Sequence, residues 1–213
     1  VRVKLAASLD GRTALASGES KWITGEPARA DVQHWRARSS AILTGIGTVL
    51  ADDPALTVRA FDIGRQPLRV VLDSRLRMSP QAKMLALPGT TLVVTAASDA
   101  VCAEALQSAG AEVLALGKDE HVDLAALMQA LAAREVNELL VEAGATLSGA
   151  LLEAGLVDEL VLYYAPLLFG DNGRGMFRLD AMTQMAARVE LEIKDARPIG
   201  RDWRILAKVA SDK

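Results

Sequence analysis

The segment 44–59 carries four side chains that could bind a charged ligand, and it directly follows a short apolar run. Thr48 can donate a hydroxyl hydrogen bond, and Asp52 and Asp53 place two carboxylates side by side. Arg59 offers a planar guanidinium that suits a phosphate or a carboxylate. Together these groups indicate a ligand-binding site rather than a linker.

Two glycines near the start of this segment favour a loop. The run 41–44 is apolar and β-prone, and Gly45 and Gly47 let the backbone turn and approach a ligand without a Cβ in the way. We therefore predict a binding loop directly after a strand. An ordinary strand-to-helix turn with a solvated acidic pair is the alternative, and Leu50 stands where a dinucleotide fingerprint would have its third glycine.

The segment 138–155 contains a second candidate site. A strand predicted at 138–142 gives way to small residues, which lead into a helix that ends near Gly155. The first amides of such a helix point outward without intrahelical partners. They can bind a pyrophosphate, for which glycine and alanine leave room.

Composition limits the classes of function. The chain has 213 residues, of which 51% are hydrophobic and 4% aromatic, so its core consists mainly of Ala, Leu and Val. A net charge of −3 disfavours nucleic acid or an anionic membrane as the main partner. With one cysteine, Cys102, and two histidines, we expect neither a disulfide framework nor a metal site. No apolar run reaches membrane-spanning length, and we predict a reducing, cytoplasmic compartment.

Hydrophobic periodicity predicts an α/β protein in a single domain, 1–213. Alternation of apolar and charged residues favours a half-buried strand over 1–8. Further strands are predicted at 41–44, 68–73, 91–95, 112–116, 138–142 and 158–166. Helices at 26–39, 100–108, 124–133 and after Gly144 give a βαβ rhythm. The tail alternates with period two over 189–193 and 203–209, which favours an antiparallel hairpin that completes the sheet.

The segment 12–25 is predicted to be a loop that contains Ser20, Trp22 and Thr24. The ring of Trp22 could stack on a base or plug the core. In a loop rich in Ser and Gly the plug is the commoner role.

Five stretches of the sequence are distinctive: KLAASLDGRTA (4–14), SKWIT (20–24), TVLADDPALTVR (48–59), VEAG (141–144) and GLVDE (155–159). They resemble the bacterial riboflavin-biosynthesis reductase, the C-terminal half of a bifunctional deaminase–reductase, nearly from end to end. The resemblance implies a three-layer dihydrofolate-reductase-like α/β fold with a mostly parallel central sheet and a C-terminal antiparallel hairpin. It also implies NADPH-dependent reduction of 5-amino-6-(5-phosphoribosylamino)uracil to 5-amino-6-(5-phosphoribitylamino)uracil.

The family's usual partner domain is a zinc deaminase with His-x-Glu and Pro-Cys-x-x-Cys motifs, which this sequence lacks. We expect that the chain does not deaminate. The missing N-terminal Met favours removal of a deaminase domain, and a separately encoded reductase is the alternative.

The resemblance places five residues at the phosphoribosyl-pyrimidine substrate: Ser20, Arg36, Leu56, Arg59 and Glu142. The two arginines suit the ribose 5-phosphate, and the carboxylate of Glu142 can accept hydrogen bonds from the pyrimidine ring or its amines. Without the resemblance, Arg36 would be interpreted as one half of a helix-surface ion pair with Asp31 or Glu26.

The resemblance places a larger set at NADPH: Ala6, Trp22, Thr48, Asp52, Ser74, Gly144, Ala145, Thr146, Leu147, Ser148, Gly149 and Ala150. Ser74, with Arg75 or Arg77, is the candidate for the 2′-phosphate. A hydroxyl and a guanidinium after a strand favour the extra charge of NADP over NAD.

The implied reaction opens the ribose to an imine that accepts a hydride at its anomeric carbon and also needs a proton. The candidate catalytic residues are Lys4, Asp52 and Glu142. Lys4 faces the cleft if the strand alternation holds, although a lysine on an edge strand is commonly solvated. Asp52 could instead hold the nicotinamide, and Asp53 is interpreted as a cap or a solvated group.

Two further interpretations are open from the sequence. The chain could reduce the pyrimidinone before deamination, that is, 2,5-diamino-6-ribosylamino-pyrimidinone phosphate, or it could be a non-catalytic NADP-binding dimerisation domain. A Rossmann dehydrogenase is disfavoured because no Gly-x-Gly-x-x-Gly follows the first strand. The resemblance also implies a homodimer, for which the apolar segment 156–169 could pair across a two-fold axis or could form a buried central strand.

Overall fold

The computed structural model describes residues 1–210, apart from the side chain of Lys118. Its contacts divide the chain into two compact units. Unit 1 combines Val1–Val32 with the chain from Val141 on, and unit 2 is Gln33–Leu140. The single-domain organisation over 1–213 stays a prediction.

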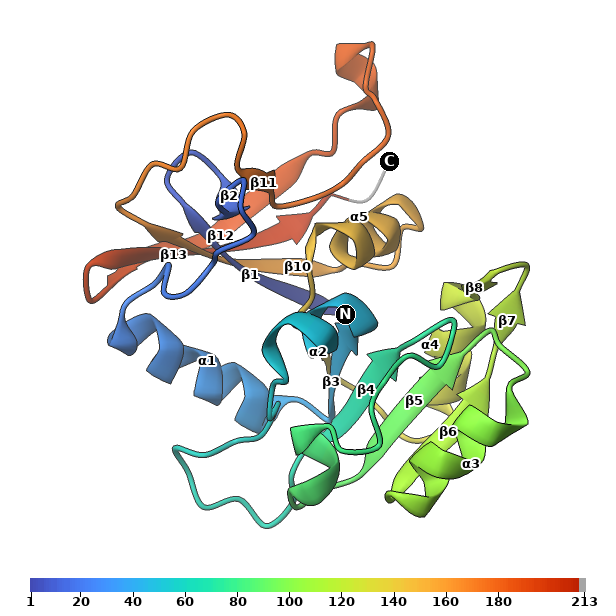
Figure 1. The fold of residues 1–213 in the computed structure, drawn as a ribbon. Coiled ribbons are helices and arrows are strands. Elements are labelled where there is room, and N and C mark those ends of the chain that lie inside the picture. Colours follow the sequence, from blue (N-terminus) through green and yellow to red (C-terminus); the bar gives the residue numbers. More distant parts are fainter. Residues whose placement is uncertain (211–213) are drawn as a thin grey trace. The chain divides into compact units, whose positions relative to one another are not determined.

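Unit 2 contains a parallel sheet whose order follows the sequence (Figure 1). The paired strands are β3 (Ala41–Gly45), β4 (Leu68–Leu72), β5 (Thr91–Thr95) and β6 (Ala111–Ala115), and β9 (Leu139–Val141) lies beside β3. Ile42, Val70 and Val93 are fully buried. Continuous apolar strands of this kind are typical of parallel sheets covered on both faces.

The helices that follow β5 and β8 begin at aspartates. Asp99 accepts a hydrogen bond from the Cys102 amide at the start of α3 (Ala100–Ser108). Asp123 accepts two amide hydrogen bonds at the start of α4 (Leu124–Ala132). Each cap stabilises its helix by about 1 kcal/mol.

The first helix of the chain, α1 (Glu26–Arg38), carries a proline in its first turn, where proline is tolerated.

A buried arginine fixes the start of β4. Arg69 is 1% exposed, and its guanidinium donates to Thr91 Oγ1 and to the carbonyls of Leu87, Pro88 and Gly89. Burial lowers the pKa of Arg69, because the charged form is desolvated. Its donors are satisfied within unit 2, so Arg69 has a structural role.

Unit 1 contains both parallel and antiparallel strand pairs. β1 (Arg2–Ser8) runs parallel to β10 (Glu159–Ala165), which pairs antiparallel with β13 (Asp202–Val209). β13 then pairs antiparallel with β12 (Leu191–Ile199), and Figure 1 shows this pair as a long ribbon. The predicted C-terminal hairpin and the mostly parallel α/β class are confirmed.

Two predictions about loops are wrong. The segment 44–59 does not start as a loop, because Gly45 caps a short helix, α2 (Ile46–Asp52), that contains Gly47. The segment 12–25 contains a short strand, β2 (Arg12–Ala14), which pairs with β11 (Arg174–Gly175).

Burial explains the apolar residues of β10 within the segment 156–169, whereas Leu168 is 76% exposed. The strand β10 lies between β1 and β13, and Leu160, Val161 and Tyr163 are at most 1% exposed. Of the two interpretations of this segment, the buried central strand is confirmed. The remaining elements are the helix α5 (Ala145–Glu153), the 3₁₀ turns η1 (Lys83–Ala86) and η2 (Met185–Ala187), and the short strands β7 (Gly117–Lys118) and β8 (His121–Val122).

Candidate active site

The alternation of β1 separates core side chains from candidate site side chains. Val3, Leu5 and Ala7 are at most 4% exposed, whereas Lys4 and Ala6 are on the opposite face and are partly exposed. The pattern predicted for this strand is confirmed. Because its side chain is a single methyl group, Ala6 leaves space on the face of β1 that also carries Lys4.

Lys4 and Glu142 come together within unit 1. The distance from Lys4 Nζ to Glu142 Oε2 is 3.9 Å, and their side chains are 18% and 11% exposed. Lys4 is thus not a solvated surface lysine. A half-buried ammonium beside a carboxylate can hold a polar substrate and exchange a proton with it.

Helix α2 aligns two further candidates. Thr48 and Asp52 are four residues apart, so they lie on one face of the helix. Asp52 occupies the last turn of α2, where the helix dipole disfavours a carboxylate by about 0.3–1 kcal/mol. A residue that breaks a local rule in this way is often kept for function.

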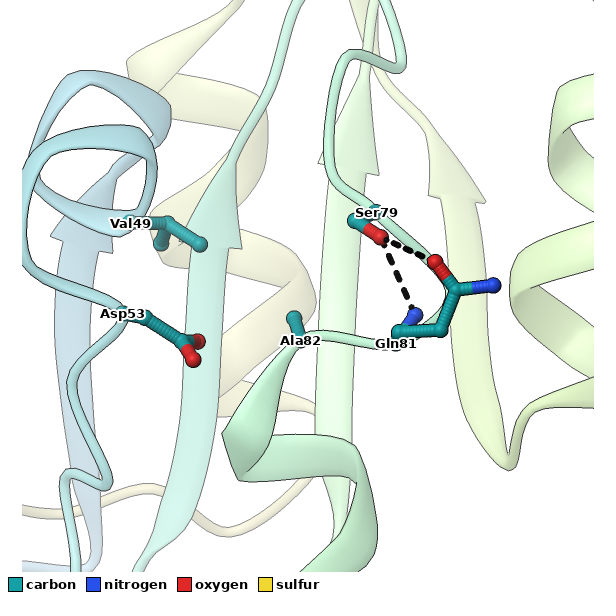
Figure 2. A pocket seen from close by; sticks show the side chains of 5 residues that line it. All are labelled: Val49, Asp53, Ser79, Gln81 and Ala82. Atoms are coloured by element: carbon teal, nitrogen blue, oxygen red, sulfur yellow. Dashed lines mark hydrogen bonds between the residues drawn. The ribbon is translucent and has the colours of Figure 1, made fainter.

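Asp53 ends α2 and has a structural role, as anticipated. Its φ is 41°, its amide donates to Val49 O, and its Oδ1 accepts from the Lys83 amide at 2.9 Å. Figure 2 shows Asp53 beside a shallow hollow in which Ser79 and Gln81 hydrogen-bond to each other. The polar groups of this hollow largely satisfy one another.

The remaining substrate candidates of unit 2 differ in what they can offer. The Arg59 amide donates to Gln33 Oε1, while its exposed guanidinium has no partner among residues 1–210. Arg36 donates from Nη1 to Thr57 O at 3.0 Å. Leu56 is 3% exposed with φ 47°, so its side chain is in the core and only its main chain could meet a substrate.

Asp31, which the alternative interpretation named as an ion-pair partner of Arg36, accepts hydrogen bonds from Arg204 and Tyr163. Arg204 donates to both carboxylate oxygens of Asp31, and the Tyr163 hydroxyl also donates to it. Asp31 therefore belongs to a network of unit 1.

Ser74 and Arg75 follow β4 after Asp73 and line a hollow of about 240 Å³. The other lining residues come from β4, α2, the turn after β4 and the β7–β8 turn: Ile46, Leu72, Arg77, Glu120 and His121. Arg75 Nη2 is 3.3 Å from Glu120 Oε2. The sequence did not indicate Glu120 and His121, because two-residue strands leave no periodic signal.

The first turn of α5 is only partly open to a ligand. Gly144 caps the helix, and a Cβ built there would meet nothing within 4 Å. A Cβ at Gly149 would lie 2.0 Å from the Arg178 carbonyl oxygen, and Ser148 is fully buried. Gly149 is therefore needed for the close approach of the Arg178 main chain. Only the turn that starts at Gly144 has an open surface where a pyrophosphate could bind.

Trp22 does not plug the core. Its side chain is 68% exposed, and the Arg29 guanidinium lies 4.6 Å from the ring centroid. The plug was expected from loop composition, which does not report tertiary burial. Ser20, two residues earlier, is partly exposed.

Residues 1–210 contain no group of three His, Cys, Asp or Glu side chains that could hold a metal ion. Within the same part of the chain, no helix is both long and apolar enough to span a membrane.

The sequence matches the family model described as "RibD C-terminal domain" over residues 1–205. The chain belongs to the RibD C-terminal domain family. The riboflavin biosynthesis protein RibD of Escherichia coli K12 is 44% identical over 215 residues, a match that covers 95% of this chain and 58% of that protein. A Buchnera aphidicola (Acyrthosiphon pisum) protein named 5-amino-6-(5-phosphoribosylamino)uracil reductase is 29% identical over 204 residues, covering 90% of this chain and 97% of that protein. This RibD C-terminal domain thus spans little more than half of its E. coli relative.

Solved structures agree on the fold of the RibD C-terminal domain. Acinetobacter baumannii RibD, form 2, matches with a TM-score of 0.86 and 42% identity, covering 98% of this chain and 57% of that chain. Dihydrofolate reductase from Enterococcus faecalis, complexed with NADP(H) and RAB-propyl, matches with a TM-score of 0.53 at 11% identity, covering 99% and 96% of the two chains. The predicted dihydrofolate-reductase-like fold is confirmed, and this second likeness shows the fold alone.

Proposed function

We propose that this chain uses NADPH to reduce 5-amino-6-(5-phosphoribosylamino)uracil to 5-amino-6-(5-phosphoribitylamino)uracil. The Buchnera protein that carries the name of this reductase matches the chain over 90% of its length. The observation that carries the proposal is the half-buried Lys4–Glu142 pair, with 3.9 Å between Nζ and Oε2. It provides a proton donor and an acceptor for a polar ring.

The residues present fit the adenosine and pyrophosphate parts of NADPH. Ser74 and the two arginines of the hollow supply donors for a phosphate, and Gly144 leaves the start of α5 uncovered. Within the segment 144–150 we propose contacts from 144–147, because Ser148 and Gly149 are buried. Thr48 and Asp52 lie on one helix face and would contact the same cofactor.

Bound NADPH supplies the hydride for the anomeric carbon of the ring-opened imine. The chain's own residues supply the rest. The Lys4 ammonium donates a proton to the imine nitrogen, which makes the carbon a better hydride acceptor, and solvent later returns a proton to Lys4. Glu142 lies 3.9 Å from the Lys4 ammonium and accepts hydrogen bonds from the pyrimidine amines. Arg59, whose exposed guanidinium has no partner among the described residues, binds the ribose phosphate together with Arg36.

The proposal is tested by mixing the purified chain with NADPH and the phosphoribosylaminouracil and following the absorbance of the reduced cofactor. We expect oxidation that depends on both substrates. A parallel reaction with the pyrimidinone that still carries its 2-amino group distinguishes the reductase that acts before deamination. No oxidation with either pyrimidine would leave a non-catalytic NADP-binding domain and would refute the proposal.

A cytoplasmic homodimer belongs to the same proposal. Leu191, Ile193 and Trp203 are 44%, 62% and 51% exposed. They lie on one face of the β12–β13 ribbon, because Leu191 is opposite Val209 and Trp203 is opposite Pro198. A second copy could bury this apolar face. Sedimentation of Ile193→Lys tests it, since a dimer formed there should dissociate.

A further inference from the structure

The hollow that contains Ser74 and Arg75 has two walls from separate parts of unit 2. One wall is the turn after β4, and the other is the turn between β7 and β8, which contributes Glu120 and His121. Ile46 and Leu72 add apolar side chains. Such a site, with an apolar floor and converging polar groups, is typical of small-ligand recognition.

The first wall is held by a buried aspartate. Asp73 is fully buried, and its Oδ2 accepts from the Met78 amide at 2.7 Å while its carbonyl accepts from the Leu76 amide. Leu76 is itself buried, with φ 51°. The turn that presents Ser74 and Arg75 therefore has a fixed course.

The second wall is also anchored. The β7–β8 turn is closed by the Asp123 amide, which donates to Leu116 O at 2.8 Å. A Cβ at Gly117 would lie 3.1 Å from Ala96 O, so β7 packs directly against the end of β5. Glu120 and His121 are thus presented at a defined place.

The polar and charged side chains of the hollow differ in whether they have hydrogen-bond or ion-pair partners. Among the described residues, neither the Arg77 guanidinium, the His121 ring nor the Ser74 hydroxyl has a hydrogen-bond or ion-pair partner. Arg75 and Glu120 contact each other at 3.3 Å, but their side chains are 71% and 80% exposed. Exposed pairs of this kind contribute little, so a phosphate can replace the carboxylate at Arg75.

From this geometry we infer that the β7–β8 turn sets the affinity for a phosphate monoester on the adenosine ribose. Glu120 holds Arg75 across the hollow and yields it to the phosphate, to which Arg77, Ser74 and His121 then donate. A ribose that carries only a hydroxyl cannot displace the carboxylate. The inference rests on the proposed function for the identity of the ligand, NADPH, but its test does not require turnover.

The test is calorimetric binding of 2′,5′-ADP and 5′-AMP, which differ only in the 2′-phosphate. Glu120→Gln should bind 2′,5′-ADP about fivefold more tightly, as expected when an exposed competing carboxylate is removed. Arg77→Gln should bind it about tenfold more weakly, because a hydrogen bond to a charged group is lost. Affinity for 5′-AMP, with or without added inorganic phosphate, should change less than about twofold in either variant.

Glu112→Gln is the matched control, because it removes the carboxylate of another exposed ion pair in unit 2, 2.7 Å from Arg134. Its affinity for 2′,5′-ADP should equal that of the parent chain. The inference is overturned if Glu120→Gln does not tighten binding, if Glu112→Gln has the same effect, or if 2′,5′-ADP does not bind. A chain that meets these expectations but does not oxidise NADPH would refute the proposed reaction and leave the phosphate site standing.

Discussion

The Lys4–Glu142 pair of unit 1 and the Arg75–Glu120 pair of unit 2 differ in how exposed their side chains are. Lys4 and Glu142 in unit 1 are 18% and 11% exposed, whereas Arg75 and Glu120 in unit 2 are 71% and 80% exposed. Water screens the exposed pair, so its partners exchange at little cost. The half-buried pair is less screened and keeps its geometry. Burial thus suits a pair that must align a reacting carbon, and exposure suits a pair that must open for a ligand.

The largest effect is expected from the half-buried pair. Lys4→Gln removes the proposed proton donor, so kcat should fall by a factor on the order of 10² to 10⁴ while NADPH affinity is kept. Steady-state kinetics with both substrates, and direct NADPH binding, measure the two quantities. Lys194→Gln, in an exposed ion pair with Glu192, is the control and should be neutral. A kcat within about twofold of the parent chain would contradict the role of Lys4.

Substitutions of the exposed residues Ser74 and Arg75 should change KM rather than kcat. Replacing Ser74 and Arg75 together by Ala should raise the KM for NADPH by an amount equivalent to about 2–4 kcal/mol, since each hydrogen bond to a charged group contributes about 1.5–3 kcal/mol. NADH carries no 2′-phosphate, so its KM should stay nearly constant. An equal change for both cofactors would show that the hollow does not bind the 2′-phosphate.

Two glycines differ in what an added Cβ would meet: at Gly149 it would clash with the main chain, and at Gly47 it would face open space. Gly149→Ala places a Cβ 2.0 Å from the Arg178 carbonyl oxygen, and such overpacking should destabilise the fold by about 1–3 kcal/mol in denaturant unfolding. Gly47→Ala, inside α2 with nothing within 4 Å of its Cβ, should instead stabilise by about 0.5–1 kcal/mol. The same sign for both variants would contradict this interpretation.

The sequence predicted most strands and long helices because their apolar residues repeat with clear periods. α3 was predicted with the bounds that it has, Ala100–Ser108. α2 was missed because it is short and contains Gly47, Thr48 and Val49, which have low helix propensity. The burial of residues such as Trp22 depends on packing, which no local pattern reports.

The candidate site was predicted only in part for the same reason. Strand alternation correctly placed Lys4 on the face opposite Val3 and Leu5, but its contact with Glu142 joins residues far apart in the chain. Glu120 and His121 were missed because a two-residue turn carries no signal of what it faces.

The smallest expected effect concerns the end of α2. Asp52→Asn removes a carboxylate from the negative end of a helix, which relieves a helix-dipole penalty on stability of about 0.3–1 kcal/mol. We expect NADPH affinity to weaken in the same variant while kcat at saturation is mostly kept. Thermal unfolding and NADPH titration measure both changes. Unchanged NADPH affinity with a collapsed kcat would assign Asp52 to proton transfer instead.

The most direct test of the two-region account is a single kinetic comparison of Lys4→Gln with the Ser74→Ala, Arg75→Ala double variant, each assayed with NADPH and with NADH. Lys4→Gln should lose kcat with both cofactors, whereas the double variant should lose only its low KM for NADPH. If both variants changed the same kinetic parameter with the same cofactor preference, the division between a buried reacting pair and an exposed phosphate site would be contradicted.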